Sequence, residues 1–300
     1  MVKLISVWGK GGVGKSTIAS SISLLYNRKG FNTLLLSTDP TPASTRILCK
    51  KEVKTPTECD GVKIIELSEE DILSLWKKRF GDEVYNVISS FLPVDYSIID
   101  YVSRAPGISD EFTLYYLYEL FKSNEYDVIV WDTTGAGGSL NLLKIEKELY
   151  EHMGDAAKLY LKVRSTLEKL RKAQYEPLEL INSWRELAKN IFDILSSNDH
   201  DLILVSEPTS LSFFVTKKIL EDLNLHNIYT RLIIINKVFN EKICSNCNFI
   251  DELVKESKDS LNLFDSIKDI EKIIIPYIDN PEKRIENIID IINEKNQKIF

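Results

Sequence analysis

The sequence predicts an α/β fold in which a mainly parallel sheet is wound by helices on both faces. Short apolar runs of strand type alternate with stretches of helical spacing through the 300 residues, and this alternation is typical of parallel sheets. A glycine-rich loop directly follows the first apolar run, and Asp or Asn ends several later runs. Because the carboxyl ends of parallel strands meet at one edge of a sheet, these polar residues are expected to surround one crevice.

The composition is that of an ordinary globular protein, with 44% hydrophobic and 28% charged residues. A net charge of −7 without a strongly basic block argues against a nucleic-acid partner. No apolar run approaches the length of about 18 residues expected of a membrane-spanning helix. Met1 leads almost directly into the first strand-type run, which leaves no room for a signal peptide. Together with four cysteines and no expected disulfide framework, these features predict a cytoplasmic protein.

The loop after the first apolar run carries a phosphate-binding pattern. It reads Gly-Lys-Gly-Gly-Val-Gly-Lys-Ser-Thr and fits G-x-x-x-x-G-K-[ST], with strand-type residues at 4–8 before it and helical spacing at 18–28 after it. Glycines let backbone N–H groups approach anionic oxygens, and the helix N-terminus adds the positive end of its dipole. We expect Lys15 to hold the β- and γ-phosphates and the Ser16 hydroxyl to bind Mg²⁺. The predicted phosphate-binding residues are Gly9, Lys10, Gly11, Gly12, Val13, Gly14, Lys15, Ser16 and Thr17.

Two acidic residues end strand-type runs that follow this loop. The run at 33–37 leads to Asp39, which is expected at the crevice and is a candidate to orient the attacking water or accept its proton. The run at 127–132 is the clearest strand of the chain and ends in Asp132, before a glycine-rich loop. An acid in that position is the Walker B arrangement, which predicts that Asp132 supports Mg²⁺ through a water molecule.

The remaining sheet elements follow the same alternation. Further strands are expected at 62–67, 201–205, 231–236 and 272–277, and further helices at 209–223 and 281–293. Pro281 suits the first position of the last helix, because proline lacks the N–H that the first helical turn leaves unpaired.

Helical spacing replaces the strand-type runs between residues 69 and 121, and again from 140 to 196. The stretch 112–121 is apolar on nearly every side, so this helix must be buried. It either packs in a core or belongs to a helical layer that receives another apolar helix in a groove, and periodicity does not distinguish the two. We expect one domain over residues 1–300, with a helical subdomain formed from about 69–122 and 140–198.

Lys10 makes the loop more specific, since the general pattern does not require a lysine after the first glycine. Such a lysine can cross a two-fold interface to the partner's nucleotide and neutralise charge that develops in phosphoryl transfer, as an arginine finger does. The loop resembles the "deviant" Walker A loop of a class of P-loop ATPases. This class includes septum-site and partition ATPases, the nitrogenase iron protein, the arsenite-pump ATPase and the ATPase that targets tail-anchored proteins. The resemblance implies a single P-loop ATPase domain, ATP and Mg²⁺ as cofactors, and a homodimer in which Lys10 acts in trans.

Further stretches resemble the arsenite-pump and tail-anchored-targeting branch of this class over nearly the whole chain. Ser37-Thr38-Asp39-Pro40 is similar to its switch I, and 126–133 is similar to its switch II. Pro106-Gly107-Ile108, followed by Asp110-Glu111, resembles a further segment of the branch. The resemblance implies catalytic roles for Asp39, Lys10 and Lys15. It also implies adenine contacts for the residues that end the last two strands, which are Asn236, Pro276 and Tyr277.

The pair Cys244 and Cys247 forms a C-x-x-C motif. One such motif supplies two ligands, whereas zinc prefers four, and a two-fold dimer would supply two motifs at its axis. The tail-anchored-targeting ATPases are similar here and hold one zinc between two subunits, so the resemblance implies a shared zinc. A thioredoxin-like redox pair and two unrelated thiols remain alternatives. Cys49 and Cys59 show no ligand set.

The sequence departs from the branch at several positions. Thr41 and Pro42 stand where the family usually has Ala-His, and Gly138 stands where it usually has a histidine. The client-binding helices of the family are often rich in methionine, but this chain has only two methionines. Leucine, tyrosine and phenylalanine are therefore the expected lining of any groove.

Three functions remain open. The first is a Mg²⁺-dependent, nucleotide-gated homodimeric ATPase that captures and targets tail-anchored membrane proteins. Its partners would be hydrophobic transmembrane segments of clients or a membrane receptor. The second is an ATPase subunit that drives an arsenite or other anion pump, for which a metalloid site would need a cluster of about three thiolates. The third is a partition or positioning ATPase, which usually requires a terminal amphipathic basic helix.

Overall fold

The computed structural model describes residues 2–39, 41, 43–91, 93–134, 177–240 and 247–295. The chain divides into two compact units. We call the first the sheet unit; it comprises Met1–Leu67, Ser123–Leu140 and Asn198–Phe300. We call the second the helical unit; it comprises Ser68–Lys122 and Asn141–Ser197. That the two are parts of one functional domain stays a prediction, and the helical spacing at 140–176 lies outside the described residues.

The sheet unit contains an eight-stranded sheet in the order β3-β4-β2-β5-β1-β6-β7-β8. Every neighbouring pair is parallel except the antiparallel pair of β3 with β4. β1 lies between β5 and β6, so the loop that follows it opens at the centre of the sheet. This architecture confirms the predicted α/β fold. The strands are β1 Lys3–Gly9, β2 Thr33–Ser37, β3 Thr57–Cys59, β4 Val62–Glu66, β5 Val128–Asp132, β6 His200–Ser206, β7 Thr230–Val238 and β8 Glu271–Pro276.

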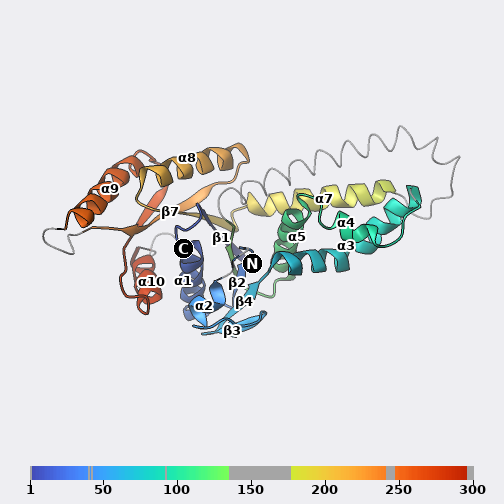
Figure 1. Cartoon of the computed structure of the whole chain (residues 1–300), viewed down its shortest axis with the longest axis horizontal. Helices are drawn as coiled ribbons and strands as arrows, with labels where there is room; N and C mark the ends of the chain where they lie inside the picture. The colour runs from blue at the N-terminus through green and yellow to red at the C-terminus, as the bar shows by residue number, and fades with distance from the viewer. Residues whose placement is uncertain are drawn as a thin grey trace. The chain divides into compact units, whose positions relative to one another are not determined.

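Helices cover both faces of this sheet. Figure 1 shows α1 and α10 on one face and α8 and α9 on the other. The described helices of the sheet unit are α1 Lys15–Arg28, α2 Ser44–Leu48, α8 Ser210–Leu225, α9 Asn248–Phe264 and α10 Arg284–Lys295.

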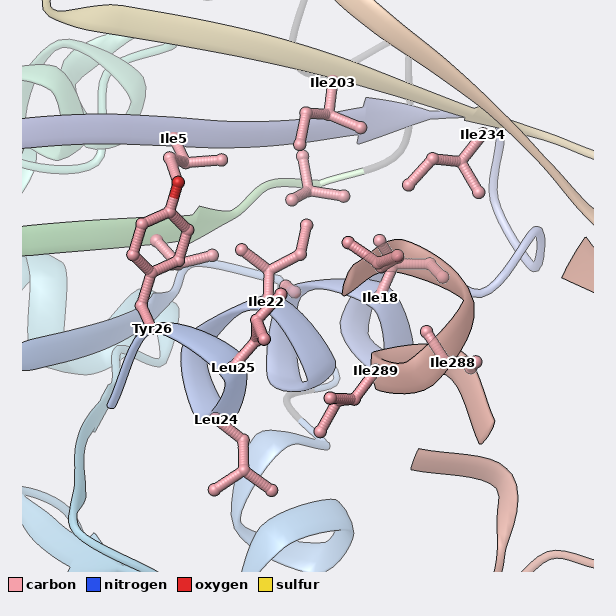
Figure 2. Close-up of a cluster of buried hydrophobic side chains, with 14 of the residues drawn as sticks. Ile5, Ile18, Ile22, Leu24, Leu25, Tyr26, Ile203, Ile234, Ile288 and Ile289 are labelled. Atoms are coloured by element: carbon pink, nitrogen blue, oxygen red, sulfur yellow. The ribbon is translucent and has the colours of Figure 1, made fainter. Parts of the chain in front are cut away.

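The core of the sheet unit lies between α1, α10 and the central strands. Ile18, Ile22 and Leu25 of α1 face the sheet, where Ile5 of β1 and Ile203 of β6 lie (Figure 2). All of them are at most 4% exposed, and a fully buried side chain of this kind contributes about 1.5–3 kcal/mol. The central strands are covered on both faces, which is why they read as continuous apolar runs rather than as alternating ones.

One cysteine expectation is wrong. Cys49 and Cys59 form a disulfide, with their Cα atoms 5.3 Å apart. Cys49 directly follows α2, and Cys59 ends the edge strand β3. The fold therefore brings together two thiols whose spacing in sequence gave no sign of pairing.

The helical unit contains α3 Glu69–Phe91, α4 Ile98–Val102, α5 Ile108–Ser123 and α7 Pro177–Leu195 among its described residues. Aromatic side chains join α3 to α5: the Phe80 ring meets the Tyr115 ring at 5.0 Å and the Phe112 ring at 6.2 Å. Beside them lies a cavity of about 320 Å³. Twelve described residues line it, five of which are aromatic, and among these twelve Glu111 is the only acidic or basic side chain. Among the described residues, no helix combines the length and apolar character that crossing a bilayer requires.

Candidate nucleotide-binding site

The predicted phosphate loop joins β1 to α1. Two of its positions require glycine because atoms of neighbouring strands lie too close for a side chain. A Cβ on Gly9 would lie 2.1 Å from the carbonyl oxygen of Val205. Gly14 has φ +99°, and a Cβ there would lie 2.5 Å from Nδ2 of Asn236. No described side chain caps the N-terminus of α1, and no acidic residue lies in its first turn. The helix therefore presents N–H donors and the positive end of its dipole to a bound anion.

Asp132 lies at the carboxyl end of β5, in register with Val7 of β1 and Ser37 of β2. Its side chain is fully buried, and Ser37 Oγ donates to its Oδ2 at 3.3 Å. The pKa of Asp132 is raised to about 6, chiefly by burial and also by the charge of Asp39, while a hydrogen bond from Ser16 and the charge of Lys15 act in the opposite direction.

The surroundings of Asp132 fit a magnesium ion. Its Oδ1 atom is buried and has no hydrogen-bond partner among the described residues, and a buried polar atom of this kind calls for a water or an ion. The hydroxyl of Ser16 and the carboxylate of Asp132 are hard oxygen donors, which Mg²⁺ prefers. The predicted metal ligands therefore lie together, with Lys15 and Asp39 close enough to shift the pKa of Asp132.

Asp39 follows β2 and is held by a short turn. Its Oδ1 accepts hydrogen bonds from the backbone N–H of Thr41 at 2.9 Å and from the Thr41 hydroxyl at 2.8 Å. The residue before it, Thr38, accepts a hydrogen bond from the indole of Trp131 at 3.0 Å, which ties this segment to β5. Pro40, Pro42 and the predicted glycine-rich loop after Thr134 lie outside the described residues.

The two lysines of the loop differ in environment. Lys15 is 5% exposed and lies near Asp132. Lys10 is half-buried, and within the described parts of the chain no hydrogen bond or ion pair engages its ammonium group. Lys15 thus lies beside Asp132 of its own chain, whereas Lys10 has no partner among the described residues.

The predicted adenine residues lie at the ends of β7 and β8. Asn236 is 7% exposed, its Nδ2 donates to the carbonyl of Val13 at 2.9 Å, and its Oδ1 accepts from the backbone N–H of Lys237. Pro276 ends β8, and the exposed ring of Tyr277 stacks on Phe239 at 4.8 Å. Adenine contact stays a prediction for all three.

Sequence reasoning missed Lys237 and Glu207. The Lys237 ammonium donates to the carbonyl of Gly12 at 2.7 Å and to the Glu207 carboxylate at 2.6 Å. Lys237 follows Asn236 directly, which was a possible signal, but nothing near Glu207 in sequence indicated a contact with the loop.

The predicted zinc pair is only half described. Cys247 is a half-exposed free thiol at the start of α9, whereas Cys244 lies outside the described residues. Within the described ranges, no group of three or more His, Cys, Asp or Glu side chains is placed to hold a metal. A zinc shared across a dimer stays a prediction.

Residues 2–294 match the family model described as "Anion-transporting ATPase". The chain is 32% identical to a protein of Aquifex aeolicus (strain VF5) assigned as arsenical pump-driving ATPase 2, over 90% of this chain and 91% of that protein. It is 28% identical to the "ATPase ASNA1 homolog" of Plasmodium yoelii yoelii, over 87% of this chain and 70% of that protein. It is 25% identical to the "ATPase ASNA1 homolog 1" of Paramecium tetraurelia, over 96% and 90% of the two chains.

Proposed function

The chain belongs to the anion-transporting ATPase family and is an ATPase, and on this premise we propose that it works as a Mg²⁺-dependent, nucleotide-gated homodimer that captures and targets tail-anchored membrane proteins. The cavity of the helical unit is the observation that carries the client part of this proposal. Its apolar lining, with a single acidic group among the described residues, suits an apolar segment that has left water.

The chemistry assigned to the site is phosphoryl transfer to water. The loop N–H groups and Lys15 would hold the phosphates, and the Ser16 hydroxyl and Asp132 would hold Mg²⁺, Asp132 through a water molecule. When bound, Mg²⁺ neutralises charge that develops on the phosphate oxygens. Thr41 occupies Oδ1 of Asp39, and no hydrogen bond to Oδ2 is observed among the described residues. Asp39 therefore has one oxygen available to orient the attacking water or take its proton.

The uncommitted Lys10 supports a homodimer. A lysine that pairs with none of the described residues of its own chain is suited to reach the nucleotide of a second copy, where its charge would stabilise the transition state. Such contacts form only when both nucleotides and both chains are present, which couples ATP binding to closure of the dimer.

The cavity must widen to hold a client helix. Its volume of about 320 Å³ lies at the lower end for ligand sites, whereas a membrane-spanning helix has about 20 residues and is about 10 Å across. We infer that closure of the dimer separates the helices that line the cavity, and that hydrolysis reverses this change.

Hydrolysis and capture are tested separately. Turnover of MgATP is measured for wild type, Lys10→Ala and Asp39→Asn; wild-type rates in both variants would refute the assigned roles. For capture, Asp39→Asn with MgATP is mixed with a soluble carrier that ends in an apolar helix of about 20 residues. The control carrier has polar residues in place of the apolar ones. Selective, MgATP-dependent recovery of the apolar fusion supports the proposal, and equal recovery of the two fusions refutes it.

An anion-pump subunit is the second candidate, favoured by the assignment of the Aquifex aeolicus protein. A site for arsenite needs about three thiolates. The disulfide between Cys49 and Cys59 leaves at most two of the four cysteines to supply thiolates, which disfavours an arsenite site within one chain. Stimulation of ATP turnover by arsenite would instead support the anion-pump function.

The structure also bears on the positioning-type alternative. Ile288, Ile289 and Ile292, on the apolar face of α10, are buried against the sheet unit. This face is therefore not available to bind a membrane.

A further inference from the structure

The end of β7 departs from a regular strand. Its register against β8 shifts between Ile235 and Val238, and Lys237 has φ +62°. In a regular strand, the side chains of consecutive residues point to opposite faces. The local bulge allows Asn236 and Lys237 to reach the same loop, where they bond the carbonyls of Val13 and Gly12 at 2.9 and 2.7 Å.

Each of these two carbonyls belongs to a peptide unit whose N–H group, on the opposite side, is a potential donor to phosphate. The N–H groups of a phosphate loop point at the anion, so the carbonyls of the same units point away and need partners elsewhere. The carbonyl of Gly12 shares its peptide unit with the N–H of Val13. A cationic donor on that carbonyl polarises the unit and makes the N–H a stronger donor to phosphate.

Glu207 fixes the lysine in this position. It follows β6, the neighbour of β7, and accepts from the Lys237 ammonium at 2.6 Å. The side chains of Lys237 and Glu207 are 41% and 23% exposed, so the pair is partly open to water. Exposed ion pairs stabilise proteins only weakly. The main effect of Glu207 is therefore to orient the Lys237 side chain, and its contribution to folding stability is small.

We propose that Lys237, oriented by Glu207, is a positioning residue that braces the Gly12–Val13 peptide of the loop for nucleotide binding. This inference rests on the proposed ATPase chemistry and adds residues to it that the P-loop pattern does not contain. Lys237 acts through the loop and touches no reacting atom. It therefore influences the binding of ADP and ATP alike and leaves the chemical step unchanged.

The test compares MgADP affinity and MgATP kinetics in matched variants. Lys237→Met removes the donor and the charge, Lys237→Arg keeps both, and Glu207→Gln leaves the lysine without its anionic partner. Lys255→Met, which removes an exposed lysine of α9, is the control. We expect Lys237→Met to raise the Kd for MgADP and the KM for MgATP roughly tenfold, the effect of one lost charged hydrogen bond, with kcat within about twofold. Glu207→Gln should weaken binding by about threefold, and Lys237→Arg should restore most of the affinity.

Melting temperatures without nucleotide separate bracing from general stability. Lys237→Met should melt within a few degrees of wild type, and MgADP should raise its melting temperature less than it raises that of wild type. The proposal is overturned by wild-type MgADP affinity in Lys237→Met, by a loss confined to kcat, or by equal defects in the Met and Arg variants. If Lys237→Met does not fold, wild-type affinity in Glu207→Gln overturns it. If wild type binds no MgADP, both this proposal and the proposed function fail.

Discussion

Replacing Glu111 by glutamine should stabilise the protein at alkaline pH but not at acidic pH. Glu111 lines the apolar cavity, and burial, followed by the charge of Asp110, raises the pKa of its carboxyl from 4.5 to about 7. The folded protein therefore keeps this proton where the unfolded chain has lost it. Stability contributed by Glu111 is fully present below about pH 4.5 and is lost as the pH rises to about 7.

The magnitude follows from this difference in pKa. Between 4.5 and about 7, at about 1.4 kcal/mol per pH unit, the charged carboxylate costs the folded state about 3 kcal/mol. Glu111 also lies in the first turn of α5, where a negative charge returns about 0.3–1 kcal/mol through the helix dipole. Glu111→Gln, which is nearly isosteric and uncharged, should therefore stabilise the protein by about 2 kcal/mol at pH 8.5.

Thermal melting without nucleotide measures this effect. Glu111→Gln should melt several degrees above wild type at pH 8.5, and the difference should shrink toward zero at pH 5. Glu119→Gln on the same helix is exposed and should differ little from wild type at either pH. A Glu111→Gln variant that is as stable as wild type at pH 8.5, or equally stabilised at both pH values, would show that the carboxylate is adequately solvated in the cavity.

Three further predictions concern the sheet unit. Gly14→Ala should abolish MgADP binding detectable by isothermal titration, because its Cβ would lie 2.5 Å from the Asn236 amide. Gly30→Ala is the control, since Gly30 has φ +91° and open space around it. This control should lower stability but leave the Kd for MgADP unchanged. Asp132→Asn should lower kcat by about 10²-fold and raise the Mg²⁺ concentration needed for half-maximal turnover, because it removes the charge of the carboxylate whose Oδ1 lacks a partner among the described residues. An unchanged Mg²⁺ requirement would place the metal elsewhere. Elemental analysis should find one zinc per two chains in wild type and none in Cys247→Ser, and metal-free wild type would remove zinc from the proposal.

The sheet and the phosphate loop could be predicted because short-range patterns encode them. β1, β2 and β5 are continuous apolar runs with a glycine-rich or acidic end, and each lies within a residue or two of its expected position. β3 was missed, since it has three residues, lies at the sheet edge and has no apolar run to reveal it. Helical spacing between residues 69 and 121 predicted helices without their bounds, and the first of these helices, α3, runs from Glu69 to Phe91.

What could not be predicted depends on contacts between distant parts of the chain. The bulge that directs Asn236 and Lys237 to the loop arises from how β7 pairs with β8. Glu207 joins them only because β6 and β7 are neighbours. The disulfide of Cys49 with Cys59 similarly depends on α2 ending beside β3. The local sequence pattern locates a phosphate loop, but the pairing of distant strands determines which side chains bond the carbonyls of that loop.

The charges around the loop divide its lysines into two kinds, and this division predicts opposite kinetic defects. Lys15 has Asp132 nearby, and Lys237 has Glu207. Of the lysines at the loop that the structure describes, Lys10 alone has no anionic partner. A compensated lysine adds to the affinity for nucleotide in the ground state, whereas an uncompensated one can add charge when the transition state forms. Lys10→Ala should therefore lower kcat by about 10³-fold or more with little change in the Kd for MgADP, and Lys237→Met should show the reverse. If both variants lost affinity and kept kcat, Lys10 would be another part of the binding loop, and the argument for a second chain at the site would lose its physical basis.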